Sequence, residues 1–200
     1  MSTLLDIIGA TIIGGMLLIT ALAFLDRTNQ HSFSCRDDLI VQENLTSTTA
    51  ILEHDLKKMG YGIAEWEQVV FTADSDHIVF RSDIDRDDVV DVVEYYSGDC
   101  TDLANTPNPD DRILYRKVNG EPSNGFKVGV VSLFNFDYLN QDGNELDTSI
   151  PDNLIAIKMV RITLKVESSF VYGSDPNPEK TAYRTAFWQQ TRLVSRNLRR

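Results

Sequence analysis

The chain has 200 residues, 42% of them hydrophobic and 24% charged, which is enough for one folded domain with a real core and too few for two large ones. This composition excludes disorder along the whole chain. The formal net charge of -11 argues against general nucleic-acid binding, because an acidic surface repels the phosphate backbone.

The charges are unevenly placed along the chain. Twelve acidic residues lie between Asp74 and Asp111, against only two arginines, whereas Lys180 to Arg200 holds six basic residues and no acid. The basic end could bind a polyanion locally. It could also pair with the acidic segment of its own fold or of a neighbouring subunit, and we favour that pairing.

The first predicted element is an apolar helix from Leu4 to Leu25. Ile7 to Leu25 is a run of nineteen residues without a charge, about the length that crosses a hydrocarbon core. A cleaved signal peptide would begin with basic residues and have a shorter apolar run, so we expect this segment to be retained. Residues 1–25 are therefore predicted to be a transmembrane helix, with little positive charge at either end to set its orientation.

Asp6 places a carboxylate at the edge of this apolar run. Ionisable groups are costly there and usually have a function, although Asp6 could also lie at the headgroup interface and reach water. Gly9 and the pair Gly14 and Gly15 allow close helix packing, and the pair is a place where a helix can bend. Asp6, Gly14 and Gly15 are accordingly the candidate assembly residues.

Helical character continues after the membrane run. Five residues repeat at intervals of four and three and so share one helix face: Leu45, Thr49, Leu52, Leu56 and Met59. Gly60 follows two lysines, a pattern typical of a helix end. We predict that residues 26–60 form an amphipathic continuation of the helix, with or without a break, whose apolar stripe packs on a sheet.

Residues 61–200 change to a period of two with many β-branched side chains, and they form the predicted β-rich globular domain. The predicted strands are Val69–Phe71, Ile78–Arg81, Val89–Tyr96, Ile113–Val118, Lys127–Leu139, Leu154–Val166 and Tyr183–Leu198. Segments rich in turn residues separate them, among them Asn119–Gly125. One helix followed by strands, without βαβ alternation, predicts an α+β fold with a mostly antiparallel sheet.

The stretch Thr3-Leu4-Leu5-Asp6-Ile7 resembles the start of processed type IV prepilins, where a similar sequence opens a long apolar helix. Residues 55–62, Asp-Leu-Lys-Lys-Met-Gly-Tyr-Gly, resemble the end of the first helix in PilW-like minor pilins. Residues 134–146 resemble a hairpin of those proteins and of the J-type pseudopilins of type II secretion. Residues 160–164 and 192–198 are similar to their last strands. The resemblance covers most of the chain.

The resemblance implies roles for several residues. In that family the acid at the position of Asp6 is thought to neutralise the terminal amine of an adjacent subunit, and opposite charges in an apolar bundle do offset each other's desolvation. The chain departs from the family because it shows no basic leader, and Met1 stands where the leader glycine would be. We expect either a start further upstream or insertion without the usual processing.

The acidic segment from Asp83 to Glu94 is the best candidate metal site. Acids fall at positions 1, 3, 5, 9 and 12 of a calcium-binding loop, at Asp83, Asp85, Asp87, Asp91 and Glu94. Position 6, which requires glycine, is Asp88, and the following strand pattern would draw Glu94 away from a closed loop. A solvated acidic turn explains the segment more simply, and calcium, which some pseudopilins hold, stays an alternative.

Cys35 and Cys100 are the only cysteines. They form either a single disulfide, if the domain lies outside the cytoplasm, or two unrelated thiols. The sequence contains no metalloprotease motif, no nucleophile elbow, and no phosphate-binding or dinucleotide-binding glycine loop, so we expect no enzyme activity.

These features predict a minor pilin or pseudopilin, held in the inner membrane by one span with its C-terminal domain in the periplasm or on the cell surface. Its expected partners are other pilin subunits, reached through the N-terminal helix, and no cofactor is expected apart from calcium. The main alternative is a single-pass binding protein that never polymerises. A third is a secreted hydrolase with an uncleaved anchor.

Overall fold

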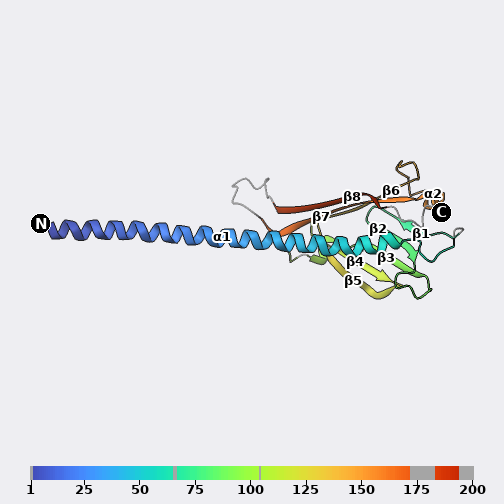
Figure 1. The fold of residues 1–200 in the computed structure, drawn as a ribbon, viewed down its shortest axis with the longest axis horizontal. Helices are drawn as coiled ribbons and strands as arrows, with labels where there is room; N and C mark the ends of the chain where they lie inside the picture. The colour runs from blue at the N-terminus through green and yellow to red at the C-terminus, as the bar shows by residue number, and fades with distance from the viewer. Residues whose placement is uncertain (1, 65–66, 104, 172–182, 194–200) are drawn as a thin grey trace. The chain divides into compact units, whose positions relative to one another are not determined.

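The computed structural model describes residues 2–64, 67–103, 105–171 and 183–193 (Figure 1). Helix α1 spans Ser2–Lys58 without a break. The chain divides into two compact units, Met1–Leu39 and Ile40–Arg200. Helix residues 40–58 therefore belong with the strands in one compact unit.

The end of α1 agrees with the sequence prediction. Lys57 and Lys58 occupy the last turn, where positive charge interacts favourably with the helix dipole. Gly60 has a φ of 77°, a left-handed conformation that glycine adopts without steric cost. Its N–H donates to the carbonyl oxygen of Arg81 at 3.0 Å, so the chain turns directly into contact with a strand.

Five strands form one antiparallel sheet, sheet A, in chain order. They are β1 (Val70–Ala73), β2 (His77–Ser82), β3 (Asp91–Ser97), β4 (Arg112–Val118) and β5 (Glu121–Val131), with the short 3-10 helix η1 (Cys100–Leu103) between β3 and β4. Every second residue of β2 is buried, from Ile78 to Ser82, which is the predicted period of two.

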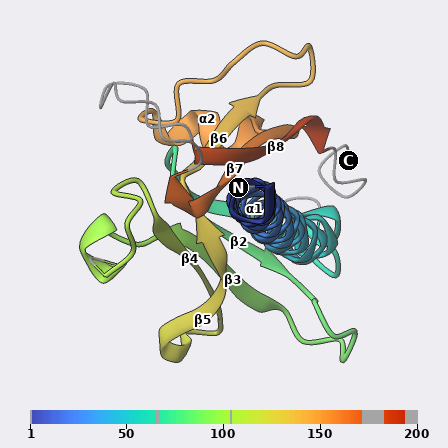
Figure 2. The ribbon, with the colours of Figure 1, turned by 90° about the vertical axis from the view of Figure 1, so that its left-hand side faces the viewer.

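Three further strands form sheet B, which is also antiparallel: β6 (Leu133–Leu139), β7 (Met159–Val171) and β8 (Tyr183–Leu193). Figure 2 shows the two sheets as separate layers, with β2 to β5 in one and β6 to β8 in the other. The expected α+β fold, a long N-terminal helix packed on antiparallel sheet, is confirmed.

One hydrophobic core joins the second part of α1 to both sheets. Its members include Val41, Leu52, Leu56 and Met59 of α1, Phe80, Tyr95 and Leu114 of sheet A, and Phe136, Ile162 and Leu164 of sheet B. Each large apolar side chain in such a core contributes about 1.5–3 kcal/mol through its removal from water. The predicted apolar stripe of the helix is therefore the face that holds the β-rich unit together.

Helix α1 and strand β5 come very close to each other at Gly129. A Cβ atom on Gly129 would lie 2.2 Å from Oγ1 of Thr48 and 2.7 Å from Oδ1 of Asn44. The Asn44 side-chain amide also donates to the carbonyl oxygen of Val130 at 2.7 Å. A residue without a side chain is thus required where the helix lies against this strand.

The prediction of a single strand over 127–139 is wrong. β5 ends at Val131 in sheet A, and β6 begins at Leu133 in sheet B. Between them the N–H of Ser132 donates to the carbonyl oxygen of Lys165 at 2.9 Å, which fixes the crossing to β7. A change of sheet leaves the alternation of side chains intact, so the sequence pattern does not reveal it.

The predicted strand over 154–166 also needs correction at its start. Its first residues lie in the short helix α2 (Pro151–Ala156), and β7 begins only at Met159. Pro151 at the first helical position and Asp152 in the first turn favour a helix there. The predicted turn 119–125 is shorter than expected, because β5 begins at Glu121. Residues 194–198 of the last predicted strand lie outside the described residues.

Candidate functional site

The N-terminal part of α1 presents an apolar surface that the unit formed by residues 1–39 does not cover. Among the described residues, α1 is the one helix whose length and composition suit a membrane span, and none of its most apolar stretch is buried. The exposed apolar side chains are Leu4, Leu5, Ile7, Ile8, Ile12, Ile13, Met16, Leu17, Leu18, Ile19, Leu22, Phe24 and Leu25. An apolar surface of this length is unfavourable in water.

The three candidate assembly residues all lie on this helix. Asp6 is exposed near its start and has no ion-pair partner among the described residues. The helix continues through Gly14 and Gly15, so the bend considered from the sequence is not present. A Cβ atom on either glycine would meet nothing within 4 Å, and their absent side chains therefore leave room for a neighbouring helix.

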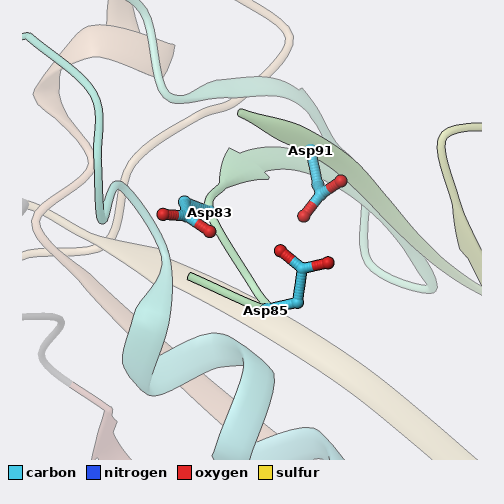
Figure 3. Close-up of side chains that lie close together, drawn as sticks. All are labelled: Asp83, Asp85 and Asp91. Carbon is cyan, nitrogen blue, oxygen red and sulfur yellow. The ribbon is translucent and has the colours of Figure 1, made fainter. Parts of the chain in front are cut away.

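The turn from β2 into β3 brings together three of the five acids of the predicted calcium loop. Asp83, Asp85 and Asp91 each offer a carboxylate oxygen, and these oxygens all lie within 4.8 Å of one another (Figure 3). Asp83 and Asp91 are buried, whereas Asp85 is exposed. Each of the three carboxylates turns toward the others in the close-up, so the loop gathers three negative charges at one point.

Backbone and side-chain amides position the carboxylates of Asp83 and Asp91. The Arg86 N–H donates to Oδ1 of Asp83 at 2.6 Å, and Asp91 accepts from the Ile84 N–H at 3.1 Å and from the Asn119 amide at 2.7 Å. Oxygen ligands held in this way suit calcium, which takes six to eight oxygens and can add carbonyls and water. The arrangement can hold a hard cation.

Asp87 and Glu94 do not join the cluster, so the loop is not an EF-hand. The Asp87 carboxylate instead accepts from the Val89 N–H at 2.8 Å, and Oε1 of Glu94 lies 3.1 Å from Nε2 of His77 across β2 and β3. Glu94 lies in strand β3 and therefore points away from the cluster, as the alternating sequence pattern indicated. Asp88, at the position where glycine was expected, has a φ of 66°, which aspartate tolerates better than most residues.

A buried ionic cluster around Asp55 was missed at the sequence level. Asp55 of α1 is only 2% exposed. Its Oδ2 accepts from the Tyr95 hydroxyl at 2.7 Å and from Nε of Arg116 at 2.6 Å, while His54 contacts its Oδ1 at 3.0 Å. The cluster joins the helix to β3 and β4 inside the β-rich unit.

The pKa values in this cluster follow from burial and from the hydrogen bonds. Burial alone raises the pKa of Asp55, but the hydrogen bonds from Arg116, Tyr95 and His54 outweigh it and leave the pKa below 3.8. Burial and the adjacent Asp55 carboxylate raise the pKa of Tyr95 well above its usual range. The pair of Asp55 and Arg116 is therefore charged at neutral pH, with Tyr95 as a neutral donor.

A sequence signal for Asp55 does exist. Asp55 lies three residues after Leu52 and four before Met59, on the same helix face as the predicted apolar stripe. An acid on a buried face requires a partner, because an unpaired buried charge is very costly. The partner comes from a strand far away in the sequence, which is why the pattern alone does not identify it.

Both cysteines are free thiols in this structure, Cys35 in the unit Met1–Leu39 and Cys100 in the unit Ile40–Arg200. Cys35 is exposed on α1, and its sulfur lies 3.9 Å from Nε2 of His31. Cys100 is half-buried at the start of η1. The pairing of Cys35 with Cys100 stays a prediction.

Comparison of the chain with known protein families, with curated proteins and with solved structures finds no match.

Proposed function

We propose that this chain is a minor pilin or pseudopilin, a structural subunit of a type IV pilus-like or type II secretion filament that acts in filament initiation or at the tip. Residues 4–25 anchor it in the inner membrane and then pack among equivalent helices of other subunits. The β-rich unit lies in the periplasm or on the cell surface. The protein has no enzyme activity in this proposal.

The observation that carries the proposal is the exposed apolar surface of the first part of α1. Such a surface is stable in a bilayer or against other apolar helices. When a subunit leaves the bilayer, the filament core provides those apolar helices. Gly14 and Gly15 add a surface without side chains on which a neighbouring helix can lie closely.

Asp6 supports assembly over simple anchoring. A membrane anchor needs no carboxylate at the edge of its apolar run, whereas a helix bundle can use one to pair with the amine of a neighbouring chain. Such a pair in a low-dielectric bundle fixes the axial register of two helices, since breaking it would leave an uncompensated charge.

The test replaces Asp6 with alanine and, as a matched control, with glutamate, in the full chain in its own cells. We expect Asp6→Ala to enter the membrane like the wild type and to reach the filament or tip-complex fraction at a level lower by about tenfold or more, because it leaves a partner charge unpaired. Asp6→Glu keeps the charge and is expected to retain most of the assembly.

Two outcomes would contradict the proposal. If wild-type protein is absent from every filament or tip-complex fraction, the chain is a membrane-anchored binding protein that does not polymerise. If Asp6→Ala assembles as well as the wild type, Asp6 is an interfacial residue without a role in register.

A further inference from the structure

Asp111 is a buried carboxylate to which no described residue donates a hydrogen bond. It is 2% exposed, and both of its oxygens are buried with no partner among the described residues. It lies directly before β4, at the end of the loop 105–111. Buried carboxylates are almost always bonded to donors, and one that is not calls for a bound ion or a proton.

The groups around Asp111 present oxygen rather than donors. The Thr106 hydroxyl is close enough to lower the pKa of Asp111, but its single proton is directed to the carbonyl oxygens of Leu103 at 2.9 Å and Asn108 at 3.2 Å. The Asn108 side-chain amide donates instead to Oε2 of Glu167 at 3.3 Å. The side-chain donors of Thr106 and Asn108 therefore both have other acceptors.

Glu167 of β7 brings a second carboxylate toward Asp111. Burial raises the pKa of Glu167, but contacts with Lys165, at 2.8 Å, and with Asn108 outweigh it and leave the pKa below its usual value, so Glu167 stays ionised. Burial and the charges of Glu167 and Asp110 raise the pKa of Asp111. Asp111 thus lies near the charges of Asp110 and Glu167, and Lys165 pairs with Glu167 alone, which leaves a net negative charge around Asp111 when the carboxylates are ionised.

We propose that Asp111 is a ligand of a calcium ion bound between the loop 105–111 and β7, with Glu167 as the second carboxylate. A divalent cation would supply the missing partner for the buried oxygens and neutralise the local charge. Calcium fits because the available groups are oxygens from carboxylates, a hydroxyl and backbone carbonyls, and because calcium accepts irregular sets of oxygen ligands.

The ion would connect the two sheets. The loop 105–111 leads into β4 of sheet A, and it already contacts sheet B through Asn108 and Glu167 and through the Tyr183 hydroxyl, which donates to the carbonyl oxygen of Pro107 at 3.2 Å. Calcium there would fasten this contact. The site shares no residue with the cluster of Asp83, Asp85 and Asp91, and it does not depend on the proposed filament function.

The test uses the full chain in detergent, freed of metal by a chelator. The parent protein carries Asp85→Asn, so that the loop between β2 and β3 contributes as little as possible to calcium binding. Calcium at a hundredfold excess over its Kd is expected to raise the Tm of the parent by about 5–10 °C. Adding Asp111→Asn should remove that shift. Adding Asp110→Asn, which removes the same charge from an exposed neighbour, should keep most of it.

In the absence of calcium, the parent should no longer have a higher Tm than its Asp111→Asn variant. A buried carboxylate without a partner disfavours the folded state, so Asp111→Asn is expected to unfold at the same temperature as the parent or higher in chelator. A cation ligand should show this dependence of relative Tm on calcium, whereas a residue that only supports packing should not.

Calorimetric titration with calcium gives the deciding second measurement if Asp111→Asn does not fold. Glu167→Gln is then expected to weaken calcium binding by about tenfold. The proposal is overturned if the parent shows no calcium response, if Asp111→Asn keeps it, or if Glu167→Gln binds calcium as the parent does, and Asp111 is then a protonated acid.

Discussion

Asp55 is a charged residue of α1 enclosed by the β-rich unit. Its carboxylate is 3% exposed and is bonded to Arg116 of β4, whose side chain is 22% exposed. Breaking such a pair by removing one member leaves the other charge without a partner, which costs more than the intact pair contributes. The cluster therefore fixes how the helix lies on sheet A.

Asp55→Ala is expected to lower the free energy of unfolding by about 3 kcal/mol, because Arg116 loses its carboxylate and Tyr95 its acceptor. Denaturant unfolding of the full chain in detergent measures this. Lys57→Ala is the matched control, since it breaks the exposed pair of Lys57 with Glu53 one turn away on the same helix and should cost less than about 0.5 kcal/mol. Equal losses for the two variants would show that Asp55 is not held as the structure has it.

The same cluster predicts a pH dependence. The folded-state pKa of Asp55 lies below its unfolded value of 3.8, so its contribution is fully present above about pH 4 and is lost as the pH falls through the folded pKa. Wild-type protein should lose stability more steeply than Asp55→Asn between about pH 5 and 2. Parallel curves for the two proteins would contradict the lowered pKa.

At the scale of single elements, the calcium-loop motif predicts only part of the acidic cluster between β2 and β3. The predicted loop positions bring Asp83, Asp85 and Asp91 together, but Asp87 turns to its own backbone and Glu94 lies in β3. The cluster is thus the candidate calcium site in a form that the linear motif does not describe.

Asp85→Asn and Asp87→Asn distinguish this cluster from an acidic turn. In an Asp111→Asn parent, calorimetric titration with calcium should show at least about tenfold weaker binding for Asp85→Asn, because a charged ligand is lost. Asp87→Asn removes the same charge from the same loop and should change the affinity by less than about threefold. Equal effects of the two substitutions, or no calcium binding by the parent, would leave the loop as a solvated turn.

Local patterns predicted the elements whose partners are near in sequence. The spacing from Leu45 to Met59 and the stop at Gly60 predicted the end of α1, and alternation predicted β2 and β3. The division at Ser132 was not predictable, because it depends on pairing with Lys165, and neither was the partner of Asp55. Pro151 did signal α2, but the apolar residues after it favoured a strand.

At the scale of the whole molecule, the helix serves two units with different surroundings. Residues 40–58 are built into the core of the β-rich unit, whereas the apolar residues 4–25 belong to a unit that leaves them exposed. A single unbroken helix therefore carries a surface that needs an apolar partner. In our proposal the bilayer supplies that partner first and the filament core supplies it afterwards.

The most direct test of this account is photo-crosslinking from the apolar part of α1 in cells that make the filament. A photoreactive residue replaces Leu17, Leu18 or Ile19 in turn, and these three neighbouring positions sample most directions around the helix. The account predicts covalent adducts with other filament subunits from at least one position. Membrane-inserted protein that gives no adduct with any protein subunit from all three positions would contradict it.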